Sequence, residues 1–320
     1  MSDHVVEFYH RQKKRWKRIL NNIFVDVTTS WKDYLALCKP KIVSLIVFTA
    51  VVGMFLSTPG MVPLSALLFG TIGIGLAAAS AAAINHVVDH RIDSIMARTL
   101  RRPLPRGKIS MQAAILFAFI LAALSMLILT CFVNTLTAIL TIVSLIGYGF
   151  VYSMYLKRAT PQNIVIGGAA GAAPPVLGWT AVTGSLEPQA LILFLIIFTW
   201  TPPHFWALAI YRRDDYASVN VPMLPVTHGV EFTRLHILLY TIILCIVTLF
   251  PYLVYMSGGL YLMGAVLLDA GFLYYVIKMQ IDRSDRLAMQ TFSYSIVYLM
   301  ALFAFLLIDH YVPLVLTTLV

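Results

Sequence analysis

The chain has 320 residues, of which 60% are hydrophobic and only 12% are charged. A soluble domain averages about 25% charged residues, so this composition excludes an ordinary soluble protein and indicates helices that face lipid. The net charge of +9 could suggest a nucleic-acid partner, but the basic residues lie between apolar runs. Cytoplasmic loop bias and anionic headgroups explain them better, so we expect membrane lipid and no nucleic acid as a partner.

The N-terminal part, residues 1–35, is a basic tail that we expect on the cytoplasmic side. Its stretch 5–24 mixes basic and apolar residues, and could be an amphipathic helix in the membrane interface or a positively charged retention tail. No apolar run precedes the basic cluster, so a cleavable signal peptide is not expected. The short tail favours a bacterial inner membrane over a mitochondrial one as the location.

Residues 36–320 are predicted to form one transmembrane domain, because they contain nine apolar runs of roughly the 20 residues that a spanning helix needs. The runs cover residues 42–58, 64–86, 112–133, 135–155, 163–183, 189–210, 235–256, 258–279 and 293–316. We therefore predict an all-α, polytopic membrane protein with nine transmembrane helices.

The segments between these runs alternate in charge. Those that carry Lys or Arg are the N-terminal tail, 90–110, 156–163, 211–234 and 278–290. Those that carry neither are the loops near residues 59, 134, 184 and 257. The positive-inside rule then puts the N terminus in the cytoplasm and the C terminus outside. The two long charged loops follow the second and sixth runs, which suggests a repeated four-helix unit.

The second run ends in a polar cluster. Asn85, Asp89 and Asp93 are spaced four residues apart, so each step drifts only about 40° and all three share one helix face. Acidic groups near a membrane are costly and usually functional. Because hard divalent ions such as Mg²⁺ take carboxylate and amide oxygens and often bridge to substrate phosphates, the cluster suits a hard divalent metal ion.

A basic segment follows this cluster, with Arg98, Arg101, Arg102 and Lys108 among its residues. Arginine forks match phosphate oxygens, so carboxylates followed by a dense basic set fit a metal-bridged diphosphate. The alternative is that the arginines are topology signals with which the aspartates pair. That alternative explains the regular Asn/Asp/Asp spacing less well.

His86 and His90 also lie four residues apart in this cluster. With Asp89 or Asp93 they could form a transition-metal site, although the HEXXH pattern is absent. A structural or interfacial role for both histidines is the alternative.

A second polar cluster ends the sixth run. Pro202 and Pro203 remove backbone hydrogen bonds, so we expect the helix to bend or break there. His204 lies beside them and could be an acid or base, a metal or haem-iron ligand, or a buried hydrogen-bonding group. Asp214 and Asp215 follow, and adjacent residues point about 100° apart on a helix. One of them could reach a metal while the other caps or pairs.

These motifs resemble a known family. The run 85–104, with its Asn/Asp/Asp spacing and following arginines, is similar to the first aspartate motif of the UbiA-type intramembrane prenyltransferases. The run 201–208 (TPPHFWAL), followed by 214–216 and 221–225, resembles the haem O synthase branch of that superfamily more specifically. The resemblance covers about residues 35–315.

The resemblance implies nine helices around a central, lipid-accessible cavity. It also implies Mg²⁺ as cofactor, farnesyl diphosphate as donor and the vinyl group of haem B as acceptor, with haem O as product. Haem O serves terminal oxidases directly or as the precursor of haem A, so haem A synthase or terminal oxidase assembly factors are expected partners.

The resemblance also assigns roles to residues. It implies a first metal at Asn85, Asp89 and Asp93, a second metal at Asp214 and Asp215, and a haem-side catalytic role for His204. It assigns the diphosphate to Arg98 and Arg102, and the neighbouring Arg101, Lys108 and Arg212 are further candidates. The second motif of the superfamily often has aspartates four apart, so which of the adjacent Asp214 and Asp215 binds metal stays open.

Two other functions stay open. One is a UbiA-type enzyme that prenylates a quinone precursor or another aromatic acceptor. The other is a secondary transporter, because repeats and broken helices also mark transporters. The acidic groups cluster at helix ends on one side, which favours a headgroup delivered from the membrane surface.

Overall fold

The computed structural model describes residues 29–318, with side chains up to residue 312. The predicted interfacial stretch 5–24 lies outside the described residues. Within the described part the chain is helical and contains no strand. The boundary drawn at residue 35 falls inside helix α2 (Trp31–Leu37), whose Tyr34 ring lies 5.0 Å from that of Phe117.

The long helices agree with the predicted apolar runs. They are α3 (Pro40–Leu56), α4 (Leu64–Val88), α6 (Met111–Phe132), α7 (Thr135–Ile146), α9 (Asn163–Ala172), α10 (Pro174–Thr183), α11 (Pro188–Tyr211), α14 (Val230–Val247), α16 (Gly259–Ile281) and α17 (Asp285–Thr318). A π-helix, η1 (Gly147–Leu156), and α8 (Lys157–Ala159) extend α7, and α15 (Phe250–Leu253) extends α14. Three short helices, α5 (His90–Asp93), α12 (Arg213–Ala217) and α13 (Leu224–Thr227), lie in the charged loops.

Eight helical segments in the described residues are long and apolar enough to cross a membrane. The count becomes nine if α2 and α3 form one span, bent by 54°. The prediction of an all-α, polytopic membrane protein is therefore confirmed. The central cavity implied by the resemblance stays a prediction.

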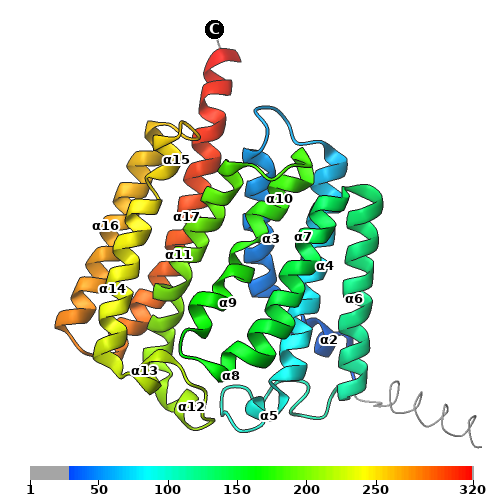
Figure 1. The fold of residues 1–320 in the computed structure, drawn as a ribbon, viewed down its shortest axis with the longest axis vertical. Coiled ribbons are helices and arrows are strands. Elements are labelled where there is room, and N and C mark those ends of the chain that lie inside the picture. The colour runs from blue at the N-terminus through cyan, green and yellow to red at the C-terminus, as the bar shows by residue number, and fades with distance from the viewer. Residues whose placement is uncertain (1–28, 319–320) are drawn as a thin grey trace, which may run out of the picture.

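The charged and uncharged segments lie at opposite ends of the bundle. Figure 1 shows α2, α5, α8, α12 and α13 at its lower end, whereas α15 and the C terminus lie at the upper end. The lower end is called the basic end below, because its loops carry the arginines and lysines. This separation agrees with the predicted alternation, and it brings both polar clusters to one end.

Local sequence sets where these helices begin and how closely they pack. Ser110 caps α6 by accepting from the Ala113 amide at 3.1 Å, and Asn134 caps α7. Helices α3 and α10 cross where only glycine fits, since a Cβ on Gly178 would lie 1.8 Å from the Ala50 carbonyl oxygen. Small residues at such crossings let helix backbones approach within a membrane.

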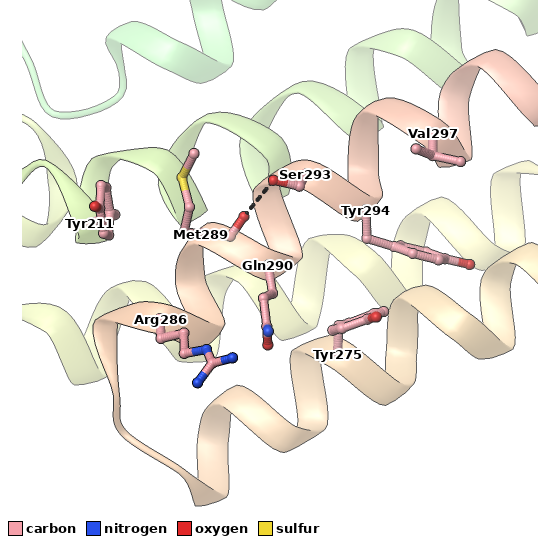
Figure 2. Close-up of a pocket in the computed structure, with 8 residues that line it drawn as sticks. All are labelled: Tyr211, Tyr275, Arg286, Met289, Gln290, Ser293, Tyr294 and Val297. Atoms are coloured by element: carbon pink, nitrogen blue, oxygen red, sulfur yellow. Dashed lines mark hydrogen bonds between the residues drawn. The ribbon is translucent and has the colours of Figure 1, made fainter.

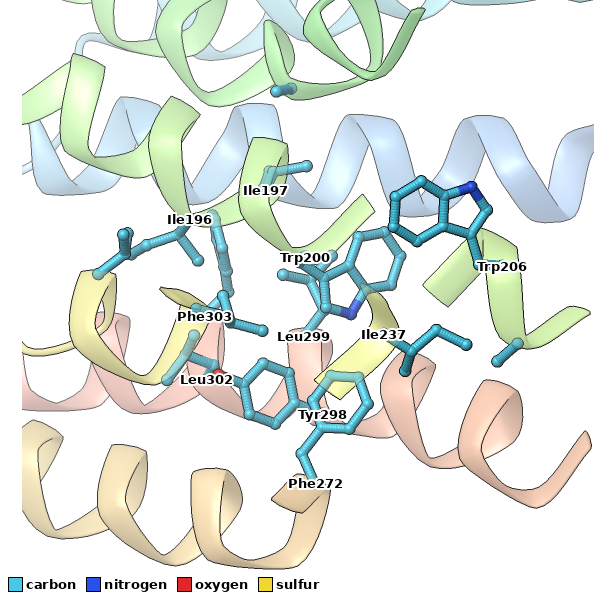
Figure 3. Close-up of a cluster of buried hydrophobic side chains, with 14 of the residues drawn as sticks. Ile196, Ile197, Trp200, Trp206, Ile237, Phe272, Tyr298, Leu299, Leu302 and Phe303 are labelled. Atoms are coloured by element: carbon cyan, nitrogen blue, oxygen red, sulfur yellow. The ribbon is translucent and has the colours of Figure 1, made fainter. Parts of the chain in front are cut away.

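The C-terminal half, made of α11, α14, α16 and α17, has a core of large side chains (Figure 3). Trp200 and Tyr298 belong to it, and both satisfy their polar atoms. The Trp200 indole donates to the Ser295 carbonyl at 2.8 Å, and the Tyr298 hydroxyl donates to Asp269 at 2.6 Å. Thr248 donates to the other Asp269 oxygen at 2.8 Å, so this buried carboxyl group links three helices.

Helix α11 continues through Pro202 and Pro203 without a break. The structure therefore contradicts a break at this point, whereas a bend stays a prediction. Neighbouring helices enclose this stretch, where residues 199–204 are all buried, and burial against them holds the prolines in place.

Candidate active site

Asn85, Asp89 and Asp93 share one face, as their spacing predicts. The Asp89 amide donates to the Asn85 carbonyl at 2.9 Å, and the Asp93 amide donates to the Asp89 carbonyl at 2.8 Å. The helical pattern thus passes through the junction of α4 and α5. All three side chains are buried, and the Asn85 amide nitrogen donates to Asp89 Oδ2 at 3.0 Å.

A basic side chain reaches each of these three residues from a different segment. Lys39, at the junction of α2 and α3, donates to Asn85 Oδ1 at 2.6 Å. Lys157 Nζ lies 2.5 Å from Asp89 Oδ2. Arg102 Nη1 lies 2.6 Å from Asp93 Oδ2. Buried carboxylates need such compensation, because an unpaired charge in an apolar environment is costly.

Helix η1 brings Lys157 to the site. A π-helix has wider turns than an α-helix, and such segments occur often at functional sites. Ser153 of η1 is buried, accepts from the Asn85 amide nitrogen at 3.3 Å and donates to the Tyr148 carbonyl at 2.9 Å. The π-helix thus contacts the carboxylate face directly, and Lys157 follows at its end.

The loop after α5 folds back on itself and so aims Arg102 at Asp93. Thr99 is fully buried and donates to the Asp93 carbonyl at 2.9 Å. Leu104 and Ile109 are also buried, so the loop is packed rather than free in solvent.

The predicted diphosphate ligands differ in their surroundings. Arg102 is in the site, whereas Arg98 and Arg101 are exposed. Lys108 is half-buried, and its carbonyl accepts from the Thr29 hydroxyl at 2.5 Å. Arg212 is half-buried on the other loop.

The oxygen donors of this face fit a hard divalent cation. Asp89 Oδ1 is buried and has no hydrogen-bond partner within the described residues, and an oxygen in that state suits a metal. The neighbouring basic side chains occupy Asn85 Oδ1, Asp89 Oδ2 and Asp93 Oδ2. Carboxylate and amide oxygens are the ligands that Mg²⁺ prefers, so the residues present fit the predicted ion.

The structure gives less support to a transition metal at His86 and His90. His86 Nδ1 lies 3.9 Å from Asp93 Oδ2. Within residues 29–312 no group of three or more His, Cys, Asp or Glu side chains comes close enough to hold a metal.

The second carboxylate pair lies in α12 and is much more open. The Asp214 side chain is 93% exposed and lies 3.6 Å from Arg213, while Asp215 is 30% exposed and lies 3.6 Å from Arg212. Arg213 also pairs with Asp285 at 2.7 Å, and this hydrogen bond raises the pKa of the Arg213 guanidinium.

The two polar loops face each other at the basic end. The Arg98 guanidinium lies 6.0 Å from the centre of the Tyr216 ring, within cation–π range. The structure thus brings the loops together without joining their four aspartates into one cluster.

The His204 side chain of α11 is held against α17. Its Nδ1 lies 2.6 Å from Ser295 Oγ, and its ring stacks on Trp200 and Phe292 at 4.1 and 4.6 Å. Ser295 Oγ also lies 2.6 Å from the Phe292 carbonyl and can only donate to it. Nδ1–H of His204 therefore donates to Ser295, which leaves Nε2 as the unprotonated nitrogen.

Sequence reasoning missed Lys39, Lys157 and Ser153 as members of the site. The two lysines flank apolar runs, where the positive-inside bias already accounts for a lysine. Nothing in the local pattern separates a site lysine from a topology signal.

These features define a multi-pass helical membrane protein with an oxygen-ligand site beside a packed basic loop. The model of the UbiA prenyltransferase family matches residues 46–315. The chain therefore belongs to the UbiA prenyltransferase family.

Curated relatives and solved structures agree with this membership. The chain is 61% identical to a protoheme IX farnesyltransferase of Nitrosococcus oceani, over 89% of this chain and 95% of that one. It is 60% identical to the protein of that name from Methylococcus capsulatus, over 89% and 96%. Among solved structures it resembles a digeranylgeranylglyceryl phosphate synthase in membranes, with TM-score 0.74, 20% identity and coverage of 87% and 98%.

A UbiA homologue from Archaeoglobus fulgidus bound to DMAPP and Mg²⁺ also shares the fold. Its TM-score is 0.59 at 17% identity, with coverage of 86% of this chain and 99% of that one.

Proposed function

We propose that this protein transfers a farnesyl group from farnesyl diphosphate to a vinyl group of haem B and so makes haem O. The observation that carries the proposal is about 60% identity, over nearly the whole length, to relatives named protoheme IX farnesyltransferase. The buried carboxylate face beside a packed basic loop supports it, because that arrangement suits a metal-bound diphosphate. The alternative acceptors, a quinone precursor or another aromatic ring, have no such support.

On the donor side, Asn85, Asp89 and Asp93 would hold Mg²⁺, which when bound supplies positive charge to the leaving diphosphate. Arg102 is fixed beside this face and donates to diphosphate oxygens, and Lys157 adds a second fixed cation. Donors that are already in place stabilise the negative charge that develops as the allylic C–O bond breaks.

The more exposed basic residues have a supporting role in this proposal. Arg98, Arg101, Lys108 and Arg212 guide the charged headgroup to the basic end, where clustered positive charge raises the local concentration of an anion. Asp215, rather than Asp214, binds the second metal, because Asp215 Oδ2 is buried and Asp214 extends into solvent.

On the acceptor side, the terminal vinyl carbon attacks the allylic cation, and a new C–C bond forms as diphosphate leaves. The cation left on the inner vinyl carbon takes up water and releases a proton. His204 serves the haem side, because its fixed ring offers an unprotonated Nε2 to haem. The apolar surroundings protect the allylic cation from water until the new bond has formed.

The location of the protein is proposed from the charge of its loops. We place the protein in a bacterial inner membrane with the basic end, and so the site, in the cytoplasm. Haem A synthase and terminal oxidase assembly factors are the partners expected to receive haem O.

The test is a reaction of purified protein with labelled farnesyl diphosphate, haem B and Mg²⁺, followed by extraction of the haem product. We expect farnesylated haem, and none when the metal is chelated. Diphosphate release without a haem product would point to another acceptor. Movement of a substrate across vesicles without any chemistry would favour the transporter and overturn the proposal.

A further inference from the structure

An open groove lies along the first turns of α17 in the C-terminal half, lined by residues of α11, α16 and α17 (Figure 2). Its volume is about 560 Å³, within the range of ordinary ligand sites. Helix α17 forms its floor, Tyr211 of α11 borders one side and Tyr275 of α16 borders the other. We call it the α17 groove. None of its lining residues has been given a role so far.

Unpaired positive charge marks the end of the α17 groove at the start of α17. Arg286 lines it and lies in the first turn of α17. Nearby arginines already have carboxylate partners: Arg213 pairs with Asp285 at 2.7 Å, and Arg234 pairs with Glu231 at 2.8 Å. Among the side chains that the structure describes, no carboxylate pairs with Arg286. The groove thus offers a cation to an anionic ligand.

The rest of the groove offers flat, polarisable surfaces. The rings of Tyr275 and Tyr294 lie 4.9 Å apart at 36°, and the Tyr294 hydroxyl donates to the Leu268 carbonyl at 2.9 Å. Met289 and Val297 add apolar surface beside them. Aromatic rings and thioethers pack well against a rigid conjugated ring system.

Two of the helices that line the groove, α11 and α17, also fix His204. Phe292 and Ser295 of α17 contact it, while the intervening Ser293 lines the groove. Tyr211 follows His204 by seven residues on α11, which puts both on one helix face about two turns apart. The α17 groove therefore flanks the helix pair that fixes the proposed haem-side residue.

We propose that the α17 groove docks haem B from the membrane, with a propionate at Arg286 and the macrocycle against Tyr275, Met289 and Tyr294. The proposal rests on the proposed function, in which haem B is the acceptor. A phospholipid would also bring an anion, but its flexible chains gain little from fixed rings. An amphiphile lying here keeps its other face against lipid, so the open side of the groove needs no protein cover.

The first experiment measures haem binding in nanodiscs of phosphatidylcholine, from the Soret band during titration with haem B and with its dimethyl ester. We expect Arg286→Gln to weaken haem B binding about fivefold, as for a partly exposed ion pair. The ester lacks carboxylates, so wild type and Arg286→Gln should bind it equally. Lys278→Gln is the matched control, since Lys278 is an exposed cation on α16 that does not line the groove.

A second variant fills the groove without touching charge. Ser293 is exposed, so Ser293→Phe should fold, and it should prevent binding at haem concentrations that saturate wild type and Ser293→Ala. In turnover, both groove variants should raise the KM for haem B and leave the KM for farnesyl diphosphate unchanged.

Three results separate the two proposals. If wild type makes no farnesylated haem, the proposed function fails. If wild type is active while Arg286→Gln and Ser293→Phe bind haem B as wild type does, the groove assignment fails alone. The groove assignment also fails if the variants bind haem B as wild type does but lose binding of phosphatidylglycerol, because the groove is then a lipid site.

Discussion

The two aspartate pairs of this protein lie at the same end of the bundle but in opposite environments. Asp89 and Asp93 are each 3% exposed and each has a basic partner within 2.6 Å. Asp214 extends into solvent and Asp215 is partly exposed, and their nearest arginine atoms are 3.6 Å away. A buried carboxylate needs a fixed partner and so a fixed position, whereas a solvated one does not. The first pair is therefore preorganised for a ligand, and the second is free to adjust when one arrives.

The strongest test of this contrast removes the buried carboxylates one at a time. Asp93→Ala should lower kcat/KM by about 10³-fold, because a ligand of the Mg²⁺ that would stabilise the leaving diphosphate is lost. Asp89→Ala should do the same. Haem O formation by purified, membrane-inserted variants is the measurement. Near-normal activity in either variant would remove that residue from the site.

Asp214→Ala is the control for the first prediction. Its exposed side chain leaves no buried partner behind, so activity should stay within about twofold of wild type. A large loss in this variant would mean that exposure is a poor guide to function here.

A smaller effect should follow from loss of the cation beside Asp89. In Lys157→Met, the lysine no longer competes with the metal ion for the Asp89 carboxylate. Mg²⁺ should therefore bind about tenfold more tightly. Binding of farnesyl diphosphate should weaken at the same time, because a fixed donor is gone. Isothermal titration with each ligand measures both, and Lys157→Arg should restore the diphosphate affinity. Parallel changes in both affinities would contradict the assignment.

His204 offers a test of the acceptor side. His204→Ala should raise the KM for haem B about tenfold, the effect of losing one hydrogen bond or ligand contact to haem, and leave the KM for farnesyl diphosphate unchanged. Because the alanine variant also leaves a hole beside Trp200, His204→Phe is needed to preserve packing. If His204→Phe retains the wild-type KM for haem B, the ring is a packing element.

The smallest effect should distinguish the two adjacent aspartates. Asp215→Asn should lower activity about fivefold at limiting Mg²⁺ and less at saturating Mg²⁺, because a weakened metal site is rescued by metal. Asp214→Asn should show no such dependence. Equal behaviour of the two variants would argue against a second metal at Asp215.

Much of the fold and part of the site could be predicted from sequence, because periodicity and charge report on local structure. The spacing of Asn85, Asp89 and Asp93 was enough to put them on one face, and loop charge was enough to sort the two ends. Lys39 and Lys157 could not be found this way, since they are 46 and 68 residues from the groups they contact. The unbroken path of α11 through Pro202 also depends on neighbouring helices that no local pattern reveals.

The π-helix η1 has a consequence for how this chain tolerates changes in length. Each residue added to or removed from a helix rotates everything beyond it, by about 100° in an α-helix and by less in the wider turns of a π-helix. A single insertion or deletion within Gly147–Leu156 would therefore turn Lys157 away from Asp89, although every side chain of the site would still be encoded. Segment length here is as much a determinant of the site as the identity of any residue, and a comparison of chains that aligns only their motifs would miss it.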